Sequence, residues 1–290
     1  LADPRVREAF ESFRFRGRVL GIPEGRICFP GEPLVRVEGT LFEAQLLETL
    51  LLSVINHDMR VASKCARVVS AAGGRDCFEF GSRRVHEQAA VDSARAAWIA
   101  GFAGTSNEEA GRRYGIPVVG TMAHSFVLAH TPDGGEAAER QAFADFASTF
   151  DQKTTALIDT YDVLQGVEYA MDGCAAKLGA VRIDSGDLER SSRAVRQRLD
   201  ARGHTDTKIL VSNDVDEYQI ESLLARGAPV DAFGVGTMAV CTPDAPALGA
   251  VYKLVAVEDD NGTMTAVQKR SSGKGGSAAP KQVLRRDGGL

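Results

Sequence analysis

Short apolar runs alternate with longer amphipathic stretches through the middle of the chain. Short runs between glycines and prolines predict buried strands, and stretches with helical periodicity predict helices between most of them. The expected strands are 77–80, 117–119, 156–159, 180–183, 208–211 and 230–233, and the expected helices are 88–102, 136–149, 165–178, 188–202 and 216–226. Strands that alternate with helices indicate βαβ units with parallel strands, and so many units in series favour a barrel over an open sheet.

Both ends of the chain have a different, β-rich pattern. The expected short strands are 17–22, 26–29 and 33–37 near the start, and 251–257 and 264–269 near the end. Thr40 and Glu43 have the spacing of a capping box, which predicts a helix that runs toward Gly73, in one piece or in two pieces that divide near Asn56. We therefore predict an α/β barrel domain over 40–249 and a β-rich domain formed by 1–39 and 250–290.

Composition narrows the class of protein. The chain has 290 residues, 44% of them hydrophobic and 25% charged, which is enough to bury a sizeable core. A net charge of −5 argues against a protein that binds nucleic acid through bulk electrostatics. The five cysteines, at 28, 65, 77, 174 and 241, form no Cys-x-x-Cys pair, so we expect reduced thiols rather than a disulfide framework or a zinc site.

The termini and the hydropathy pattern bear on where the protein works. The N-terminal residues do not resemble a signal peptide, and no apolar run is long enough to cross a bilayer. We therefore expect a cytoplasmic protein with neither a membrane nor a nucleic-acid partner. Because the chain begins with Leu1 and stops just after a strand-like segment, we also expect that material is missing at both ends.

The loop after the predicted strand 180–183 carries the densest chemistry. It contains Asp184, Ser185, Gly186 and Asp187, and Arg182 immediately precedes it. Ligands bind at the carboxyl edge of parallel sheets and barrels, where two acids can hold Mg²⁺ or hydroxyl groups and an arginine offers a planar donor fork. A strand–turn–helix with Asp or Ser as the N-cap would have the same residues, so this segment alone leaves both interpretations open.

Two further loops that follow predicted strands carry ring and cationic side chains. Phe80 is followed by Arg83 and Arg84, and paired arginines suit a carboxylate or a phosphate. Phe80 taken alone fits a core residue as well as a ligand contact. A lone histidine is more often structural than catalytic, but His124 stands on a strand-end loop between the hydroxyls of Thr121 and Ser125, which strengthens the case for a chemical role.

Glycines and acids mark the ends of two other predicted strands. Gly234, Gly236 and Thr237 follow the strand 230–233 and are typical of a phosphate cradle, because glycines let backbone amides approach an oxyanion. Asp159 and Asp162 form another acid pair, although either could cap the helix that follows. Separate stations for anions and Mg²⁺ suit a substrate with a monophosphate at one end and a diphosphate at the other.

These loops occur together, and in the same order, in a known enzyme family. The motifs are Glu79–Arg84, Gly101–Asn107, Gly115–Ser125, Asp159–Asp162, Arg182–Leu188, Phe233–Thr237 and Tyr252–Leu254. Over nearly its whole length the chain resembles the nicotinate phosphoribosyltransferases, which are type II phosphoribosyltransferases. The resemblance implies an irregular, TIM-like α/β barrel with a β-rich second domain. It also implies the reaction of nicotinate with phosphoribosyl pyrophosphate to give nicotinate mononucleotide and pyrophosphate, in NAD salvage, with Mg²⁺ as cofactor and ATP as co-substrate.

The resemblance also implies roles for single residues and an assembly. His124 matches the histidine that ATP phosphorylates, and an imidazole nitrogen can serve as such a nucleophile. The residues expected to bind nicotinate are Phe80, Arg83, Ser106, Thr121 and Arg182. The residues expected to bind phosphoribosyl pyrophosphate are Ser185, Gly186, Gly234, Gly236 and Thr237. Asp184 and Asp187 are expected to act in catalysis and to hold Mg²⁺, and a homodimer is expected to place the active site near its interface.

Ser106 bears on the choice of base, because the related nicotinamide enzyme carries an acid at this position that would repel a carboxylate.

Two features depart from the family: an N-terminal aromatic region is absent, and Pro280 replaces the glycine usual before Lys281. The tail 269–286 is otherwise expected to be a solvated loop. The alternatives are a nicotinamide or a quinolinate phosphoribosyltransferase, a barrel aldolase, which the absence of a strand-end lysine disfavours, or a truncated, silent paralogue that oligomerises or senses a metabolite.

Overall fold

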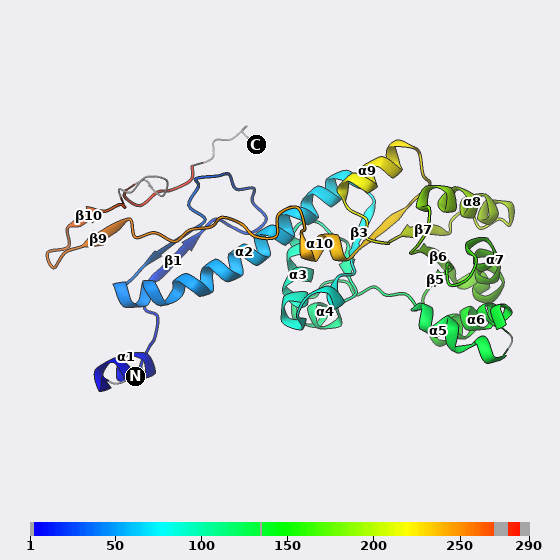
Figure 1. Ribbon diagram of the computed structural model, residues 1–290, viewed down its shortest axis with the longest axis horizontal. Helices are drawn as coiled ribbons and strands as arrows, with labels where there is room; N and C mark the ends of the chain where they lie inside the picture. Colours follow the sequence, from blue (N-terminus) through cyan, green and yellow to red (C-terminus); the bar gives the residue numbers. More distant parts are fainter. Residues whose placement is uncertain (1–2, 134, 270–277, 285–290) are drawn as a thin grey trace. The chain divides into compact units, whose positions relative to one another are not determined.

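The computed structural model describes residues 3–133, 135–269 and 278–284. The chain forms two compact units, one from 1–57 with 248–290 and the other from 58–247. Figure 1 shows their elements in chain order. The boundaries drawn from the sequence, at 39/40 and 249/250, differ from these, because α2 (Leu41–Ala71) contributes to both units. Most of the tail 269–286 lies outside the described residues.

The first unit contains short antiparallel pairs and the start of α2. The elements are α1 (Pro4–Glu11), β1 (Arg18–Gly21) paired with β2 (Val35–Glu38), and β9 (Ala256–Glu258) paired with β10 (Met264–Ala266). The expected strand 26–29 is wrong: the structure has no strand over these residues, and the Phe29 amide donates to the Glu32 carboxylate at 2.9 Å. The strands expected over 251–257 and 264–269 are shorter in the structure, with three residues each.

The capping box that begins α2 is confirmed. The Thr40 amide donates to Glu43 Oε2 at 3.1 Å, and the Glu43 amide donates to Thr40 Oγ1 at 3.3 Å. The helix then continues through Asn56 without a break, so the two-piece alternative is wrong. The Asn56 side chain does not interrupt the helix, because it bonds instead to the backbone of Leu248, donating to its carbonyl at 2.7 Å and accepting from its amide at 3.3 Å.

The second unit is built on a six-stranded parallel sheet in the order β4-β3-β8-β7-β6-β5. Its strands are β3 (Asp76–Glu79), β4 (Gly104–Thr105), β5 (Thr154–Leu157), β6 (Leu178–Ile183), β7 (Lys208–Val211) and β8 (Ala232–Val235). Within the described residues the edge strands β4 and β5 do not pair with each other, so the sheet is a curled half-barrel. The predicted α/β barrel class is confirmed in this form.

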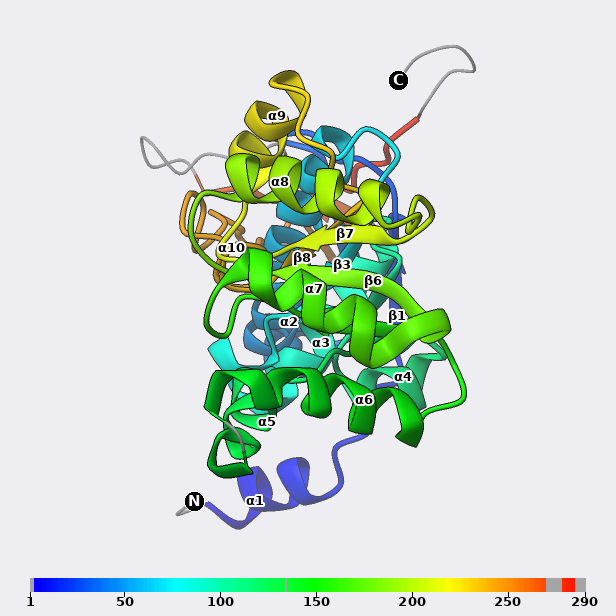
Figure 2. The ribbon, with the colours of Figure 1, turned by 90° about the vertical axis from the view of Figure 1, so that its right-hand side faces the viewer.

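Helices cover the sheet between successive strands. After α2 they are η1 (Ser82–Arg84), α3 (Glu87–Ile99), α4 (Glu108–Tyr114), α5 (His124–Ala129), η2 (Thr131–Asp133), η3 (Gly135–Ala138), α6 (Glu139–Thr149), α7 (Val163–Cys174), η4 (Ala175–Lys177), α8 (Leu188–Ala201), α9 (Glu217–Ala225) and α10 (Thr237–Cys241). Figure 2 shows α6, α7 and α8 side by side over the strands β5 to β7. No helix in the described part of the chain is long and apolar enough to span a bilayer.

One expected strand, 117–119, is wrong. Only Val118 forms a bridge, with Thr105. Pro117 has no amide hydrogen to donate to a ladder, so the segment is held by the Thr105 amide, which donates to the Pro117 carbonyl at 3.0 Å, and by the Val119 amide, which donates to the Thr105 carbonyl at 2.9 Å.

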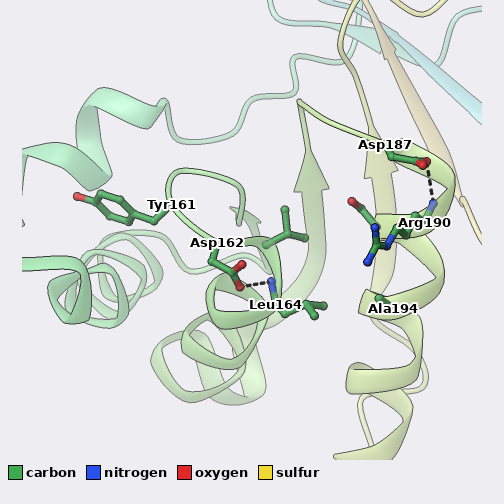
Figure 3. A pocket seen from close by; sticks show the side chains of 8 residues that line it. Tyr161, Asp162, Leu164, Asp187, Arg190 and Ala194 are labelled. Atoms are coloured by element: carbon green, nitrogen blue, oxygen red, sulfur yellow. Dashed lines mark hydrogen bonds between the residues drawn. The ribbon is translucent and has the colours of Figure 1, made fainter.

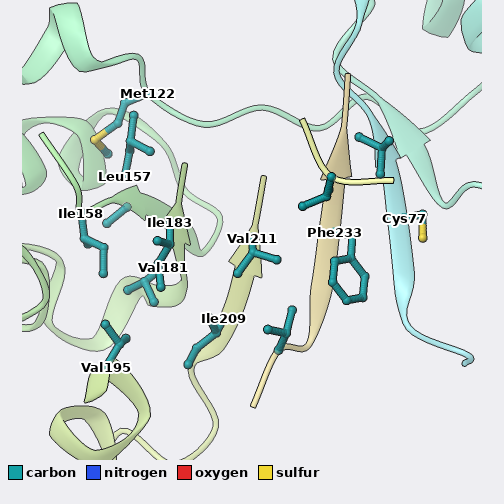
Figure 4. Packing of buried hydrophobic residues seen from close by; sticks show 14 of the residues in the cluster. Cys77, Met122, Leu157, Ile158, Val181, Ile183, Val195, Ile209, Val211 and Phe233 are labelled. Atoms are coloured by element: carbon teal, nitrogen blue, oxygen red, sulfur yellow. The ribbon is translucent and has the colours of Figure 1, made fainter. Parts of the chain in front are cut away.

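The core explains why the sheet forms. Val181 and Ile183 of β6, Ile209 and Val211 of β7, and Phe233 of β8 are fully buried, and Figure 4 shows them packed across neighbouring strands. Strands buried on both faces must carry apolar residues along most of their length. Polar residues therefore gather where the strands end, and the parallel arrangement brings these carboxyl ends to one edge.

Candidate functional site

Arg182, the next-to-last residue of β6, is held by partners from several loops. Its Nε donates to Ser212 Oγ at 2.9 Å and its Nη1 donates to Thr121 Oγ1 at 3.0 Å. Its Nη2 donates to Asp184 Oδ1 at 2.8 Å. Its guanidinium carbon lies 5.4 Å from the centre of the Phe80 ring, within the range of a cation–π contact. The structure thus brings together four residues that the sequence selected, and adds Ser212.

A buried carboxylate, Asp159, connects the loop after β6 to the start of α5. Its Oδ2 accepts from the Asp184 amide at 2.9 Å and from Ser185 Oγ at 2.5 Å. Its side chain is only 1% exposed, and its Oδ1 has no hydrogen-bond partner within the described residues. That oxygen lies 3.6 Å from Nε2 of His124. A buried carboxylate oxygen without a partner is costly, so this atom is suited to receive a proton donor.

His124 is the first residue of α5 and is reachable from solvent, with 40% of its side chain exposed. Its Nδ1 lies 3.1 Å from Thr160 Oγ1, and its Nε2 lies 4.0 Å from Asp184 Oδ2. The imidazole is therefore oriented by groups on both sides, one hydroxyl and two carboxylates. Such an arrangement can orient an imidazole nitrogen toward a reactive group.

Glu79, at the end of β3, anchors the two loops that carry Phe80 and Ser106. Its carboxylate is fully buried, accepts from Thr105 Oγ1 at 2.6 Å, and accepts from the Gly81 amide. Burial raises the pKa of Glu79 above its ordinary value, although both hydrogen bonds oppose the shift. Its backbone carbonyl accepts from the amide and the hydroxyl of Ser106 at 3.0 and 3.3 Å. Ser106 is thus fixed beside the end of β3.

The glycines after β8 have a packing role independent of any ligand. A Cβ on Gly234 would lie 2.6 Å from the Phe80 ring, and a Cβ on Gly236 would lie 2.9 Å from the Phe80 carbonyl oxygen. Both positions need glycine because Phe80 approaches so closely. Thr237 begins α10. The predicted phosphate cradle lies here next to Phe80, and its ligand stays a prediction.

The remaining predicted residues lie at the rim. Arg83 is exposed on η1. Gly186 has φ +74°, a conformation that favours glycine, and Asp187 follows it as the N-cap of α8, accepting from the Arg190 amide at 3.0 Å. The capping interpretation of Asp187 is therefore confirmed, and its role toward Mg²⁺ stays a prediction.

An open hollow of about 360 Å³ lies between the N-termini of α7 and α8. The two helix caps, Asp162 and Asp187, line it together with Tyr161 and Arg190 (Figure 3). Asp162 accepts from the amides of the first turn of α7 at 3.0 and 2.8 Å. Within the described residues, no cluster of three or more His, Cys, Asp or Glu side chains has the arrangement of a metal site.

Two residues of this site, Ser212 and Glu79, were not selected from the sequence, and Asp159 was noted only as part of an acid pair. Ser212 directly follows β7, and Asp159 follows β5. The rule that selected Asp184, a polar residue just after a buried strand, would have selected Ser212 as well. Glu79 is the last residue of β3, and only its burial distinguishes it from an ordinary strand residue.

Comparison with known proteins gives consistent matches. The sequence profile of the nicotinate phosphoribosyltransferase (NAPRTase) family matches residues 76–287, and that of the NAPRTase N-terminal domain matches residues 2–56. Nicotinate phosphoribosyltransferase pncB1 of Mycobacterium tuberculosis is 50% identical over 98% of this chain and 62% of its own length. The chain therefore spans less than two thirds of that relative.

Solved structures agree with these matches. Human nicotinic acid phosphoribosyltransferase is similar with a TM-score of 0.69 and 28% identity, over 81% of this chain and 58% of the human chain. Nicotinate-nucleotide pyrophosphorylase from Pyrococcus furiosus has a TM-score of 0.69 and 29% identity, over 86% of this chain and 68% of its own.

Proposed function

Because the chain belongs to the nicotinate phosphoribosyltransferase family, we propose that it transfers the phosphoribosyl group of phosphoribosyl pyrophosphate to nicotinate, giving nicotinate mononucleotide and pyrophosphate for NAD salvage. The observation that carries the proposal is the position of Arg182, whose guanidinium lies over the Phe80 ring beside Thr121. An aromatic face next to a fixed guanidinium is a suitable site for a flat ring that bears a carboxylate.

The donor count of Arg182 supports nicotinate as the base. A guanidinium has five N–H groups, and three of them bond to Ser212, Thr121 and Asp184. The two that remain can serve the carboxylate, while the pyridine ring lies against Phe80. Ser106 brings a neutral hydroxyl near the base, so it does not repel the anion. Arg83, from the exposed η1 turn, would complete the binding of the base.

We place phosphoribosyl pyrophosphate along the ends of β6 and β8. Gly234, Gly236 and Thr237 would receive its 5′-phosphate, and the turn from Ser185 to Asp187 would receive the ribose and the pyrophosphate. The pyridine nitrogen forms a bond to the anomeric carbon, while the bond from that carbon to pyrophosphate breaks and the leaving group takes the electron pair. The enzyme therefore contributes mainly positioning and stabilisation of the developing charge.

The donor chemistry fits Mg²⁺, which prefers carboxylate oxygens and substrate phosphates. Asp184 and Asp187 would hold it, and the buried Asp159 Oδ1, which lacks a hydrogen-bond partner in the described part of the chain, leaves further oxygen capacity nearby. When bound, the ion would neutralise charge on pyrophosphate as it leaves. The role of the chain's own residues is to fix these oxygens: Ser212 and Arg182 hold Asp184, and the first-turn amide of Arg190 holds Asp187.

ATP coupling through His124 is the second part of the proposal. An imidazole nitrogen would attack the γ-phosphorus of ATP, ADP would leave with the electron pair, and water would later hydrolyse the phosphohistidine. The exposure of His124 and its position between Thr160 and Asp159 support this role. We further propose that the protein is a cytoplasmic homodimer with the site near its interface. Light scattering of the purified protein would test whether it is a dimer.

The deciding experiment measures turnover of the full-length protein with nicotinate, nicotinamide and quinolinate side by side. We expect nicotinate to be the preferred base. Preference for quinolinate with release of carbon dioxide, preference for nicotinamide, or no turnover of any base would each overturn the assignment, and the last outcome would support a silent paralogue.

The ATP step has its own test. Radioactive ATP labelled at the γ-phosphate should label the wild-type protein and the control variant His130→Ala. His130 is a suitable control because both of its ring nitrogens already have hydrogen-bond partners, the Phe126 carbonyl and Asp145. His124→Ala should lose both the label and the stimulation of turnover by ATP. Label that persists in His124→Ala would show that another residue carries the phosphoryl group.

A further inference from the structure

Ser212 occupies a connecting position between the two substrate stations. It directly follows β7 and is only 3% exposed. Its Oγ accepts from Nε of Arg182 at 2.9 Å and donates to Oδ1 of Asp184 at 2.5 Å. Arg182 also donates directly to the same Asp184 oxygen at 2.8 Å. The three side chains therefore form a closed triangle of hydrogen bonds.

The direction of these bonds is determined by chemistry. A guanidinium can only donate, an ionised carboxylate can only accept, and a hydroxyl has one proton to give. Ser212 must therefore accept from Arg182 and give its proton to Asp184, which is the shortest contact of its hydroxyl; the Ile183 carbonyl lies farther away, at 3.5 Å. A residue that cannot both accept and donate cannot replace it.

The backbone around Ser212 is held at both ends. Asn213 and Asp214, the next two residues, have φ values of +90° and +50°, a region in which Asn and Asp are enriched among the residues other than glycine. Val215 is then fully buried, and Asp216 caps α9 through the amides of Tyr218 and Gln219 at 3.1 and 2.9 Å. The turn and the packing after it thus fix the chain that follows Ser212 and keep Ser212 at the strand end.

Ser212 also lies too deep to serve as a ligand contact. A Cβ on Gly234 would lie 3.4 Å from its Cβ, so β8 covers it on that side. With its hydroxyl committed to Arg182 and Asp184, it can act on a substrate only through these two residues.

We propose that Ser212 is a positioning residue that couples the base station at Arg182 to the ribose and pyrophosphate station at Asp184. The inference rests on the proposed function, which assigns Arg182 to the nicotinate carboxylate and Asp184 to the phosphoribosyl side. Loss of the hydroxyl leaves Arg182 Nε and Asp184 Oδ1 each short of one partner. Both side chains then shift, and the binding of both substrates weakens together.

The test compares Ser212→Ala with Ser192→Ala in the full-length protein. Ser192 is a matched control, because it is fully buried on α8 and its hydroxyl donates to the Glu189 carbonyl at 3.0 Å, outside the proposed site. The KM of each substrate is measured at saturating concentration of the other, with the Tm of each variant. We expect Ser212→Ala to raise both KM values about tenfold or more, as loss of a hydrogen bond to a charged group implies. Ser192→Ala should lower the Tm without changing either KM.

The outcomes separate the two proposals. Wild-type protein without nicotinate turnover overturns the proposed function and this inference with it. Wild-type turnover with unchanged KM values in Ser212→Ala, a rise in only one KM, or equal rises in Ser192→Ala overturns the inference alone. If Ser212→Ala does not fold, Ser212→Cys takes its place, because a thiol keeps the size but is a weak donor and acceptor. The same joint rise is expected there, and unchanged KM values overturn the coupling.

Discussion

Replacing Arg182 should separate the two substrates of the proposed reaction. Arg182→Ala removes the two N–H groups available to the nicotinate carboxylate. Hydrogen bonds to charged groups contribute about 1.5–3 kcal/mol each, so the pair corresponds to about 3 kcal/mol or more, and the KM for nicotinate should rise about a hundredfold or more. Asp184 keeps its bond from Ser212 in this variant. It loses the bond from Arg182, however, so the KM for phosphoribosyl pyrophosphate should rise about tenfold, well short of the rise for nicotinate.

The assay measures both KM values for wild-type, Arg182→Ala, Arg182→Lys and the control Arg112→Ala. Lysine keeps the charge without the planar fork and cannot reach three partners at once, so Arg182→Lys should lie between the wild-type and the alanine variant for nicotinate. Arg112 is exposed and paired with Glu109 on α4, and its loss should change neither KM. Equal losses for both substrates in Arg182→Ala would refute the reasoning and move Arg182 to the pyrophosphate side.

Four further predictions address stability and specificity. The Lys64 side chain is 1% exposed and pairs with Glu217 at 2.7 Å, so Lys64→Met should lower the free energy of unfolding in urea by about 3 kcal/mol. Arg67 is 43% exposed, so Arg67→Met should lower it by less than about 1 kcal/mol. Equal losses in the two variants would contradict this prediction. Burial raises the pKa of Glu217, but the hydrogen bonds from Lys64 and Arg67 outweigh burial and set this pKa below its ordinary value of 4.5. The stabilisation from ionised Glu217 is therefore present above pH 4.5 and is lost as the pH falls through the folded-state pKa. An acid-unfolding slope that is unchanged in Lys64→Met would count against this prediction. Burial raises the pKa of Glu79, so the free energy of unfolding of the wild-type protein should fall as the pH rises from 4.5 through the raised pKa. Glu79→Gln should lose this pH dependence. A pH dependence retained in the variant would exclude Glu79 as its source. Ser106→Asp should raise the KM for nicotinate and lower that for nicotinamide, and a parallel change in both would argue against a role in base choice.

Periodicity alone predicts the long elements of the second unit well. The strand 208–211 is found with the predicted bounds, and the helix predicted over 188–202 is α8, Leu188–Ala201. The short helices α5 and α10 were not predicted, because helices of six and five residues show no periodic pattern and depend on tertiary packing for their stability. His124 thus proves to be a helix residue, where a loop was expected.

The β-rich ends were predicted less well, for a physical reason. A strand is stable only with a partner, and alternating apolar residues indicate a candidate without showing what it pairs with. The segment before β9 contains Tyr252, whose hydroxyl donates to the Ala44 carbonyl of α2 at 3.0 Å, and it forms no ladder. A tertiary contact of this kind leaves no trace in local periodicity.

Strand order accounts for the part of the site that the sequence could not show. Sequence patterns place Asp159, Asp184 and Ser212 each after a strand, but they do not say which strands are neighbours. The sheet order puts β6 between β5 and β7, with Arg182 in register with Leu157 on one side and Leu210 on the other. Only this order allows Asp184 to bond to both flanking loops.

The same order explains how the two halves of the site come together. Phe80 follows β3, which lies next to β8, and β8 lies next to β7. The ring therefore reaches Arg182 of β6 across the ends of β8 and β7, and Gly234 of β8 has no side chain to block it. A Cβ at Gly234 would lie 2.6 Å from Phe80 and displace it from beneath the guanidinium, whereas it would meet Ser212 of the triangle only at 3.4 Å, which is van der Waals contact. The contact of Phe80 with the base ring depends on the pairing of β3 with β8, whereas the carboxylate and ribose contacts depend on the pairing of β6 with β7. A change that weakens the pairing of β3 with β8 should therefore weaken the ring contact first. A change that weakens the pairing of β6 with β7 should weaken the carboxylate and ribose contacts first.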